Sequence, residues 1–192
     1  MNCATNKQQA SHRWNTKTLV MIGMMTALTC VLGPFSVPLP FSPVPLSLTS
    51  LVIYFSVYVL GMRGGTLSCI IYALLGLAGM PVFSGFTGGP GKLFGPTGGY
   101  IIGFIFMALI CGVFIDRWPD KWYLCFGGML LGTVACYIFG SSWLAYQNNL
   151  TFFAALMAGV IPFIPGDLIK MILALLLGTA LRKALIRARL IG

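Results

Sequence analysis

Long apolar stretches, separated by short polar segments, make up most of the chain. Five of them carry no charged residue and come close to the roughly 20 residues that a helix needs to cross a bilayer. A sixth contains ionisable residues, Lys170 among them. The pattern predicts an all-α integral membrane protein with six transmembrane helices, at about residues 18–33, 46–62, 65–80, 98–115, 122–144 and 166–185.

The region between Lys121 and Asp167 contains no charge, so other signals must divide it. Asn148 and Asn149 belong to a polar break, and the apolar piece after it, residues 151–164, ends among prolines. Its roughly 14 residues are too few to cross a bilayer as a helix. We expect residues 151–164 to form an interfacial or re-entrant segment that does not span the membrane.

The N-terminal segment is basic through Lys17 and leads into the first apolar stretch, an arrangement that also occurs in signal peptides. No Ala-x-Ala-like cleavage site follows that stretch, and residues 27–30 make a poor lipoprotein box. We therefore expect residues 1–17 to form a polar cytoplasmic tail and the first helix to be retained.

The composition agrees with a membrane protein. Of the 192 residues, 58% are hydrophobic and 8% are charged, whereas about 25% are charged in an ordinary soluble protein. The length suits one domain. This composition excludes disorder, a coiled coil and almost any water-soluble fold.

The net charge of +9 would favour nucleic-acid binding in a soluble protein. Here the basic residues cluster at the ends of apolar stretches, so no nucleic-acid partner is expected. With six spans, ten Lys and Arg residues fall on one side of the membrane and only Lys92 on the other. Because such residues concentrate in cytoplasmic loops, both termini are predicted to be cytoplasmic. A seventh span at 151–164 would carry the basic C-terminal tail across the membrane.

The two longer connections on the noncytoplasmic side differ in character. Residues 33–45 carry five prolines and are predicted to be stiff and non-helical. Residues 81–97 combine five glycines with Phe83, Phe86 and Phe94, so the backbone is pliable and the side chains are apolar. Such a loop suits a lid over an apolar ligand, although a loop that rests on the bilayer surface would have the same composition.

Two ionisable residues fall at membrane depth, where a charge costs roughly 3 kcal/mol or more and by default marks a site. Pro165 and Gly166 are predicted to break the chain just before the last helix, and Asp167 falls at or near its N-cap. Lys170 lies three residues further on and shares the same helical face. The pair can offer a ligand both an acceptor and a cation. Alternatively, Asp167 caps the helix and pairs with Lys170, which neutralises both.

Glycines at three positions have different expected roles: access for a ligand, a turn of the chain, and close packing of a helix. Residues 95–100 open the fourth helix, where bare N–H groups and the positive end of the dipole face outward, and Gly98 would let a ligand come near. The glycines that begin at Gly61 are expected to form only a tight cytoplasmic turn. Gly23 and Ala27 form a small-xxx-small pattern that lets another membrane helix pack closely.

Four motifs, in order along most of the chain, resemble those of the BioY family, the biotin-binding membrane subunits (S components) of energy-coupling factor (ECF) transporters. The combination of Gly-Pro-Thr-Gly-Gly-Tyr with a later Pro-Gly-Asp-x-x-Lys is specific. Relatives often have glutamine where this chain has Thr49, so no ligand role is assigned to that residue. The motifs lie at residues 44–49, 79–85, 95–100 and 162–170.

The resemblance implies a six-helix subunit of the bacterial cell membrane that binds biotin from outside. It also implies a transmembrane coupling protein and two ATPases as partners, with Gly23 and Ala27 on the docking surface. Asp167 and Lys170 would orient the ureido group of biotin and Lys92 would meet its carboxylate, or these two roles are exchanged. The remaining expected ligand-binding residues are Gly98, Tyr100, Phe86 and Trp143.

The alternatives are an S component for another small vitamin, a self-sufficient carrier and a membrane enzyme. No GxxxxGK[ST] loop is present, so ATP hydrolysis is assigned to partners. A carrier is disfavoured because no inverted repeat is obvious and only one buried acid is available to couple ions. An enzyme is disfavoured because Asp116 and Asp120 flank a cytoplasmic turn and His12 lies in the tail. We expect no catalytic residue, metal or cofactor.

Overall fold

The computed structural model describes residues 15–38, 40, 44–119 and 121–188. Most of the predicted tail, together with His12, Pro43 and Asp120, therefore lies outside the described residues. Helices dominate the described chain, and the two short strands pair antiparallel. The elements are α1 (Thr16–Leu32), β1 (Ser36–Val37), β2 (Leu46–Ser47), α2 (Thr49–Leu77), α3 (Pro90–Leu93), α4 (Gly98–Arg117), α5 (Trp122–Gln147), α6 (Phe152–Gly159), the 3-10 turn η1 (Ile161–Phe163) and α7 (Ile164–Arg187).

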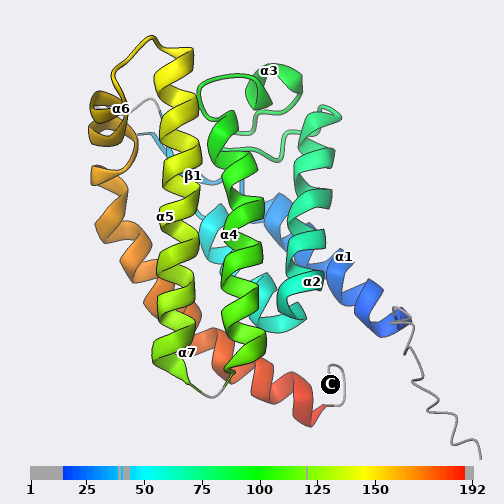
Figure 1. Cartoon of the computed structure of the whole chain (residues 1–192). Helices are drawn as coiled ribbons and strands as arrows, with labels where there is room; N and C mark the ends of the chain where they lie inside the picture. Colours follow the sequence, from blue (N-terminus) through cyan, green and yellow to red (C-terminus); the bar gives the residue numbers. More distant parts are fainter. Residues whose placement is uncertain (1–14, 39, 41–43, 120, 189–192) are drawn as a thin grey trace, which may run out of the picture.

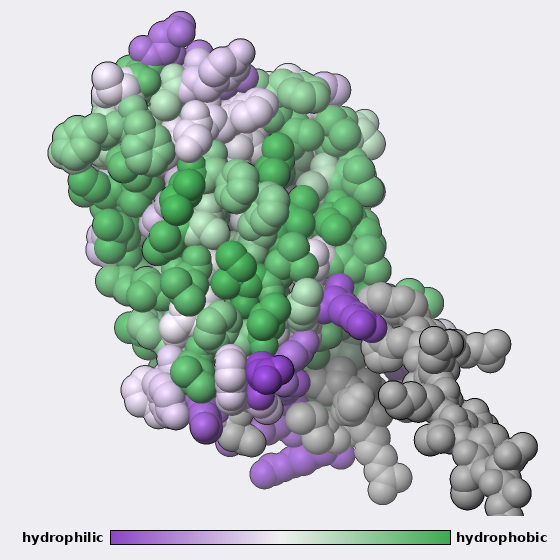
Figure 2. All heavy atoms as spheres, in the orientation of Figure 1, coloured by the Kyte–Doolittle hydropathy of each residue, from purple (hydrophilic) through white to green (hydrophobic). Residues whose placement is uncertain are grey.

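The helices form a bundle in which α4 and α5 run side by side (Figure 1). Small residues allow this close approach, because a Cβ atom on Gly132 would lie only 2.7 Å from the sulfur of Cys111. Helix α2 packs against α1, α4 and α7, so it holds the other side of the bundle together. On the face that Figure 2 shows, a broad apolar belt covers the helices between two more polar ends. The molecule is therefore an all-α membrane protein, as the sequence predicts.

Helix α2 folds back on itself at Gly61, whose φ of 71° and ψ of −174° are not helical. A Cβ atom on Gly65 would lie 2.8 Å from the Cα atom of Val57, which is impossible in one straight helix. The backbone N–H of Met62 donates to Oδ2 of Asp116 at 2.7 Å, which satisfies one free donor at the start of the second half. The tight turn predicted at Gly61 is thus confirmed, and the predicted spans 46–62 and 65–80 are the two halves of α2.

The number of membrane crossings stays a prediction. By length and composition, four stretches of the described chain could cross a bilayer, but one of them, Thr49–Leu77, folds back at Gly61, and α1 is shorter. The first half of α2, residues 49–60, would be about 18 Å long, less than the ~30 Å hydrocarbon core. The four segments are Thr49–Leu77, Gly98–Arg117, Trp122–Gln147 and Phe152–Leu185.

The last helix begins earlier than predicted. Helix α7 starts at Ile164, directly after η1, so Pro165 and Gly166 lie in its first turn and do not break the chain. Proline is tolerated there because its missing N–H would have no helical acceptor. The predicted non-spanning segment 151–164 contains the eight-residue helix α6 and η1. Its place at the interface stays a prediction.

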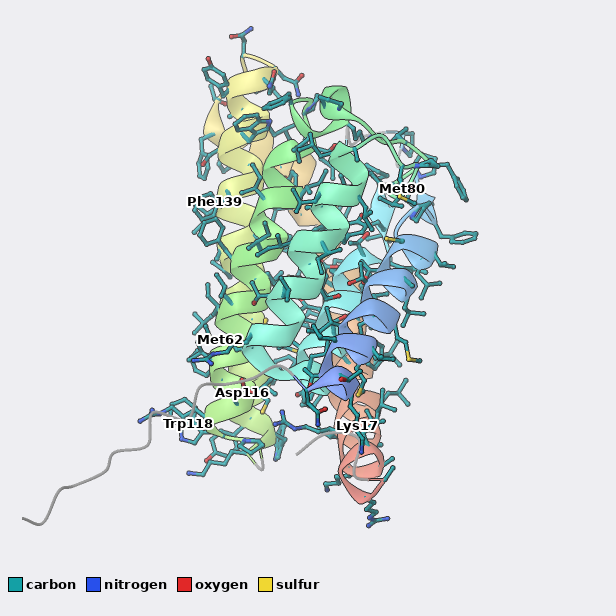
Figure 3. All side chains as sticks on the ribbon, turned by 90° about the vertical axis from the view of Figure 1, so that its right-hand side faces the viewer. Lys17, Met62, Met80, Asp116, Trp118 and Phe139 are labelled. Atoms are coloured by element: carbon teal, nitrogen blue, oxygen red, sulfur yellow. The ribbon has the colours of Figure 1, made fainter. Side chains whose placement is uncertain are left out.

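The described basic connections gather at one end of the bundle. Figure 3 places Lys17, Met62, Asp116 and Trp118 toward the same end, with Met80 toward the other. Arg63 follows Met62, and Arg117 lies between Asp116 and Trp118, so these basic residues belong to the first of the two ends. The positive-inside rule assigns that end to the cytoplasm, and this assignment stays a prediction.

Two cysteines introduced at opposite ends of α5 test the topology. A membrane-impermeant maleimide is expected to label Asn148→Cys in intact cells and Pro119→Cys only after permeabilisation, because the basic end should be inside. Both positions are exposed, and the unsubstituted chain controls for its own cysteines. Labelling of Pro119→Cys, but not Asn148→Cys, from outside would show the reverse orientation.

Candidate functional site

A small cavity with several polar side chains in its wall lies inside the bundle, between the start of α2 and helices α4, α5 and α7. Its open volume is about 70 Å³, and most of its wall is apolar or aromatic. Residues outside the long helices border it, namely Val44 to Ser47 before α2 and Phe83, Ser84 and Thr97 between α2 and α4. The polar residues of the wall are Ser47, Thr49, Ser50, Tyr72, Ser84, Thr97, Tyr100, Thr133, Tyr137, Asp167 and Lys170.

Asp167 and Lys170 form a buried ion pair in this wall. The Nζ atom of Lys170 lies 2.9 Å from Oδ1 of Asp167, and the two residues are 7% and 8% exposed respectively. Lys170 also donates to the carbonyl oxygen of Ser47 at 2.7 Å and to the hydroxyl of Ser50 at 3.2 Å. The predicted pairing is present and both residues face a cavity. The predicted capping role was wrong, because α7 begins at Ile164, so Asp167 is its fourth residue and its carboxylate accepts from the side chains of Lys170 and Tyr137.

Tyr137 is a site residue that sequence reasoning missed. Its hydroxyl donates to Oδ2 of Asp167 at 2.6 Å. Tyrosine is enriched at membrane interfaces, whereas Tyr137 lies well inside the predicted span 122–144. A tyrosine hydroxyl there requires a partner within the protein, and that requirement was the signal in the sequence.

Tyr100 lines the cavity as predicted, and its ring packs where Gly140 leaves space. Its hydroxyl donates to the carbonyl oxygen of Gly159 at 3.0 Å, which ties α4 to the end of α6. The hydroxyl of Thr97, beside the start of α4, is buried without a hydrogen-bond partner among the described residues. A polar group of a ligand would satisfy it.

Gly98 does not reach the cavity wall. A Cβ atom there would collide with the carbonyl oxygen of Leu93, so in this conformation the glycine permits close packing of the protein's own backbone. Sequence reasoning expected it to admit a ligand. Trp143, another expected ligand residue, also lies outside the wall, and its indole N–H donates to the carbonyl oxygen of Gly95 at 2.9 Å.

Lys92 and Phe86 likewise lie outside the wall of the cavity. Lys92 sits on α3 and is partly buried, which lowers the pKa of its ammonium group because desolvation disfavours the charge. Phe86 is 62% exposed and contacts Phe35 edge to face, with ring centroids 5.5 Å apart. The structure thus brings Asp167, Lys170 and Tyr100 to one cavity and leaves the other four residues outside its wall, and the ligand role of all seven stays a prediction.

The glycine-rich connection 81–97 packs over the end of the bundle opposite the basic connections, where Figure 1 shows α3. Phe83, which belongs to this connection, is buried and contacts Tyr72 edge to face, with ring centroids 5.6 Å apart. The side-chain amide of Gln147 donates to the carbonyl oxygen of Phe94 at 2.6 Å, so the connection is fastened to the end of α5. Its position suits the predicted lid, and its opening stays a prediction.

The small-residue surface of α1 faces away from the bundle. Gly23 and Ala27 are exposed, and a Cβ atom on Gly23 would meet nothing within 4 Å. The face of α1 that packs against the bundle includes Thr26, whose hydroxyl lies 3.0 Å from the hydroxyl of Ser68 on α2. Their docking role stays a prediction.

These features define a helical membrane protein with an enclosed polar site inside its bundle. The sequence model of the BioY family matches residues 6–187, so the chain belongs to the BioY family.

Individual relatives agree with this assignment. The chain is 39% identical to the biotin transporter BioY of Thermotoga maritima, over 87% of this chain and 96% of that one. It is 34% identical to the biotin transporter BioY of Lactococcus lactis subsp. cremoris, over 87% and 91%. The fold is similar to the crystal structure of the S-component for biotin from an ECF-type ABC transporter, with a TM-score of 0.81, 34% identity, and coverage of 87% and 91%.

Proposed function

We propose that this chain is the biotin-binding S component of an ECF transporter, which takes up biotin from outside the cell membrane. The observation that carries the proposal is the buried pair of Asp167 and Lys170, which faces a cavity inside the bundle of a BioY-family chain. A transmembrane coupling protein and two ATPase subunits would supply the energy, and ATP hydrolysis would occur on those subunits.

The chemistry of the cavity suits biotin. The ureido group offers one carbonyl acceptor and two N–H donors, which match the ammonium of Lys170 and the carboxylate of Asp167. The apolar part of the wall, which includes Phe104 and Phe163, suits the sulfur-containing ring and the aliphatic tail. Lys92 remains the candidate for the biotin carboxylate, provided that the connection carrying α3 moves inward.

The site must widen when the ligand enters. The open volume is about 70 Å³, whereas pockets for small molecules usually have about 300 Å³ or more. The wall residues outside the long helices include residues 44–47 and 83–84, which lie in the connections before α2 and between α2 and α4. We therefore assign the widening to these two connections.

Binding by the purified chain tests the proposal. The chain is purified in detergent from cells grown with biotin, and the small molecule that copurifies is identified by mass spectrometry. Titration calorimetry of the ligand-free chain then measures the affinity for biotin. Copurification of a different vitamin, or no heat with biotin, would contradict the proposed ligand.

Transport in liposomes separates the S component from a self-sufficient carrier. Liposomes with the chain alone are expected to accumulate no biotin, and those that also contain the coupling protein and ATPases are expected to accumulate it only with ATP. Uptake by the chain alone without ATP would favour the carrier.

A further inference from the structure

We propose that Tyr137 is a positioning residue: its hydroxyl holds Asp167 so that Oδ2 can accept a hydrogen bond from an N–H group of the ligand. The inference rests on the proposed function, because the N–H group meant is one of the two in the ureido ring of biotin. It concerns a residue on α5 that acts through Asp167 on α7.

The hydrogen bonds of the ion pair leave one useful position open. An ammonium group has three donors, and Lys170 directs them to Ser47, Ser50 and Asp167. A carboxylate has about four acceptor positions. Oδ1 of Asp167 accepts from Lys170 and, at 3.4 Å, from the hydroxyl of Ser50. Oδ2 accepts from Tyr137, which leaves one further acceptor position on that atom among the described residues.

A ligand can therefore form a hydrogen bond with Asp167 more easily than with Lys170. To receive a hydrogen bond from Lys170, it must displace a partner that the ammonium already has. To donate a hydrogen bond to Oδ2 of Asp167, it displaces none of the described partners. The direction of the open position depends on the orientation of the carboxylate, and the 2.6 Å bond from Tyr137 fixes that orientation through Oδ2, the oxygen that Lys170 does not contact.

The surroundings of Tyr137 keep this bond in place. Tyr137, Thr133 and Asp167 line the central cavity and also a second, apolar groove of about 330 Å³ between α5, α6 and α7. Leu130, Val134 and Ile138 form the α5 side of that groove, and they are 44% to 53% exposed on the surface that faces the bilayer. Hydrocarbon offers no acceptor, so the Tyr137 hydroxyl has its partner only toward Asp167.

Tyr137→Phe removes the hydroxyl and keeps the ring. We expect the affinity for biotin to fall about tenfold, as measured by titration calorimetry on the purified chain, because a hydrogen bond to a carboxylate is lost. The matched control is Tyr58→Phe. Tyr58 is a buried tyrosine on α2, and among the described residues it neither lines the cavity nor forms a hydrogen bond with a residue of the cavity wall. We expect this control to bind biotin within threefold of the unsubstituted chain.

A ligand analogue distinguishes positioning from a general loss of structure. Biotin methylated at both ureido nitrogens has no N–H group to donate, so its binding should not depend on the orientation of Oδ2. The ratio of the affinity for biotin to the affinity for this analogue is expected to fall about tenfold in Tyr137→Phe and to stay unchanged in Tyr58→Phe. Thermal midpoints of both variants establish that each is folded.

The outcomes separate this inference from the proposed function. If the unsubstituted chain does not bind biotin, the proposed function fails. A second case is that the unsubstituted chain binds biotin and Asp167→Ala abolishes that binding. If Tyr137→Phe then leaves the ratio of the affinities for biotin and the methylated analogue unchanged, the positioning role alone is overturned. Equal weakening of biotin and the methylated analogue would also overturn it, because that result indicates damage to the fold or to the cavity as a whole.

Discussion

Replacing Asp167 or Lys170 with alanine is expected to weaken biotin binding about 30-fold to 1000-fold. Each substitution removes a hydrogen bond that a charge strengthens and leaves the partner's charge buried without its counterion. Together these effects cost roughly 2–4 kcal/mol. The structure supports a value in this range, because both residues are more than nine-tenths buried and lie 2.9 Å apart.

Titration calorimetry on the purified variants measures the effect. Asp116→Ala is the matched control, because Asp116 is also paired with a base, Arg182, at 3.8 Å, but lies outside the cavity wall. We expect this control to bind biotin within threefold of the unsubstituted chain. The double variant of Asp167 and Lys170 leaves no unpaired charge and should remain folded, yet it should not recover binding. Binding within threefold for both single variants would show that the pair does not hold the ligand.

The parts of the site that were predictable are those with an unusual residue type for their position. Asp167 and Lys170 stand out because they are charges beside long apolar stretches, and the structure does bring them to one cavity. Tyr137 and Ser50 contribute to the same hydrogen-bond network. They were missed because a tyrosine or serine in an apolar stretch does not reveal which helix it will face.

The fold was predictable in its helices and less so in their ends. Apolar length predicts where a helix runs, and Gly61 marked a turn because the glycines and Arg63 interrupt the apolar pattern. The start of α7 was wrong by two residues, since Pro165 and Gly166 have the same sequence signal inside a first turn as before it. The expected ligand role of Gly98 depended on what packs against the backbone, which composition does not reveal.

Replacing Ala27 with tryptophan is expected to abolish assembly with the proposed coupling protein, and uptake with it, while biotin affinity stays unchanged. Gly23 and Ala27 are exposed on α1, where the absence of long side chains allows another helix to come close. A tryptophan there would hold the two helices several ångströms apart and lose their dispersion contacts. No described residue of α1 lines the cavity, so binding should not change.

Copurification with tagged partner subunits, uptake in proteoliposomes and calorimetry on the isolated chain measure the three quantities separately. Leu176→Trp is the control, because Leu176 is 63% exposed on α7 and the same bulk there faces lipid on a different helix. We expect that variant to assemble and transport normally, since a bilayer accommodates an added apolar ring that a helix interface cannot. Normal assembly of Ala27→Trp would place the docking surface on another helix. Loss of biotin binding in Ala27→Trp would instead mean that this face of α1 supports the site or the fold. Calorimetry uses the chain without its partner subunits, so impaired docking cannot explain such a loss.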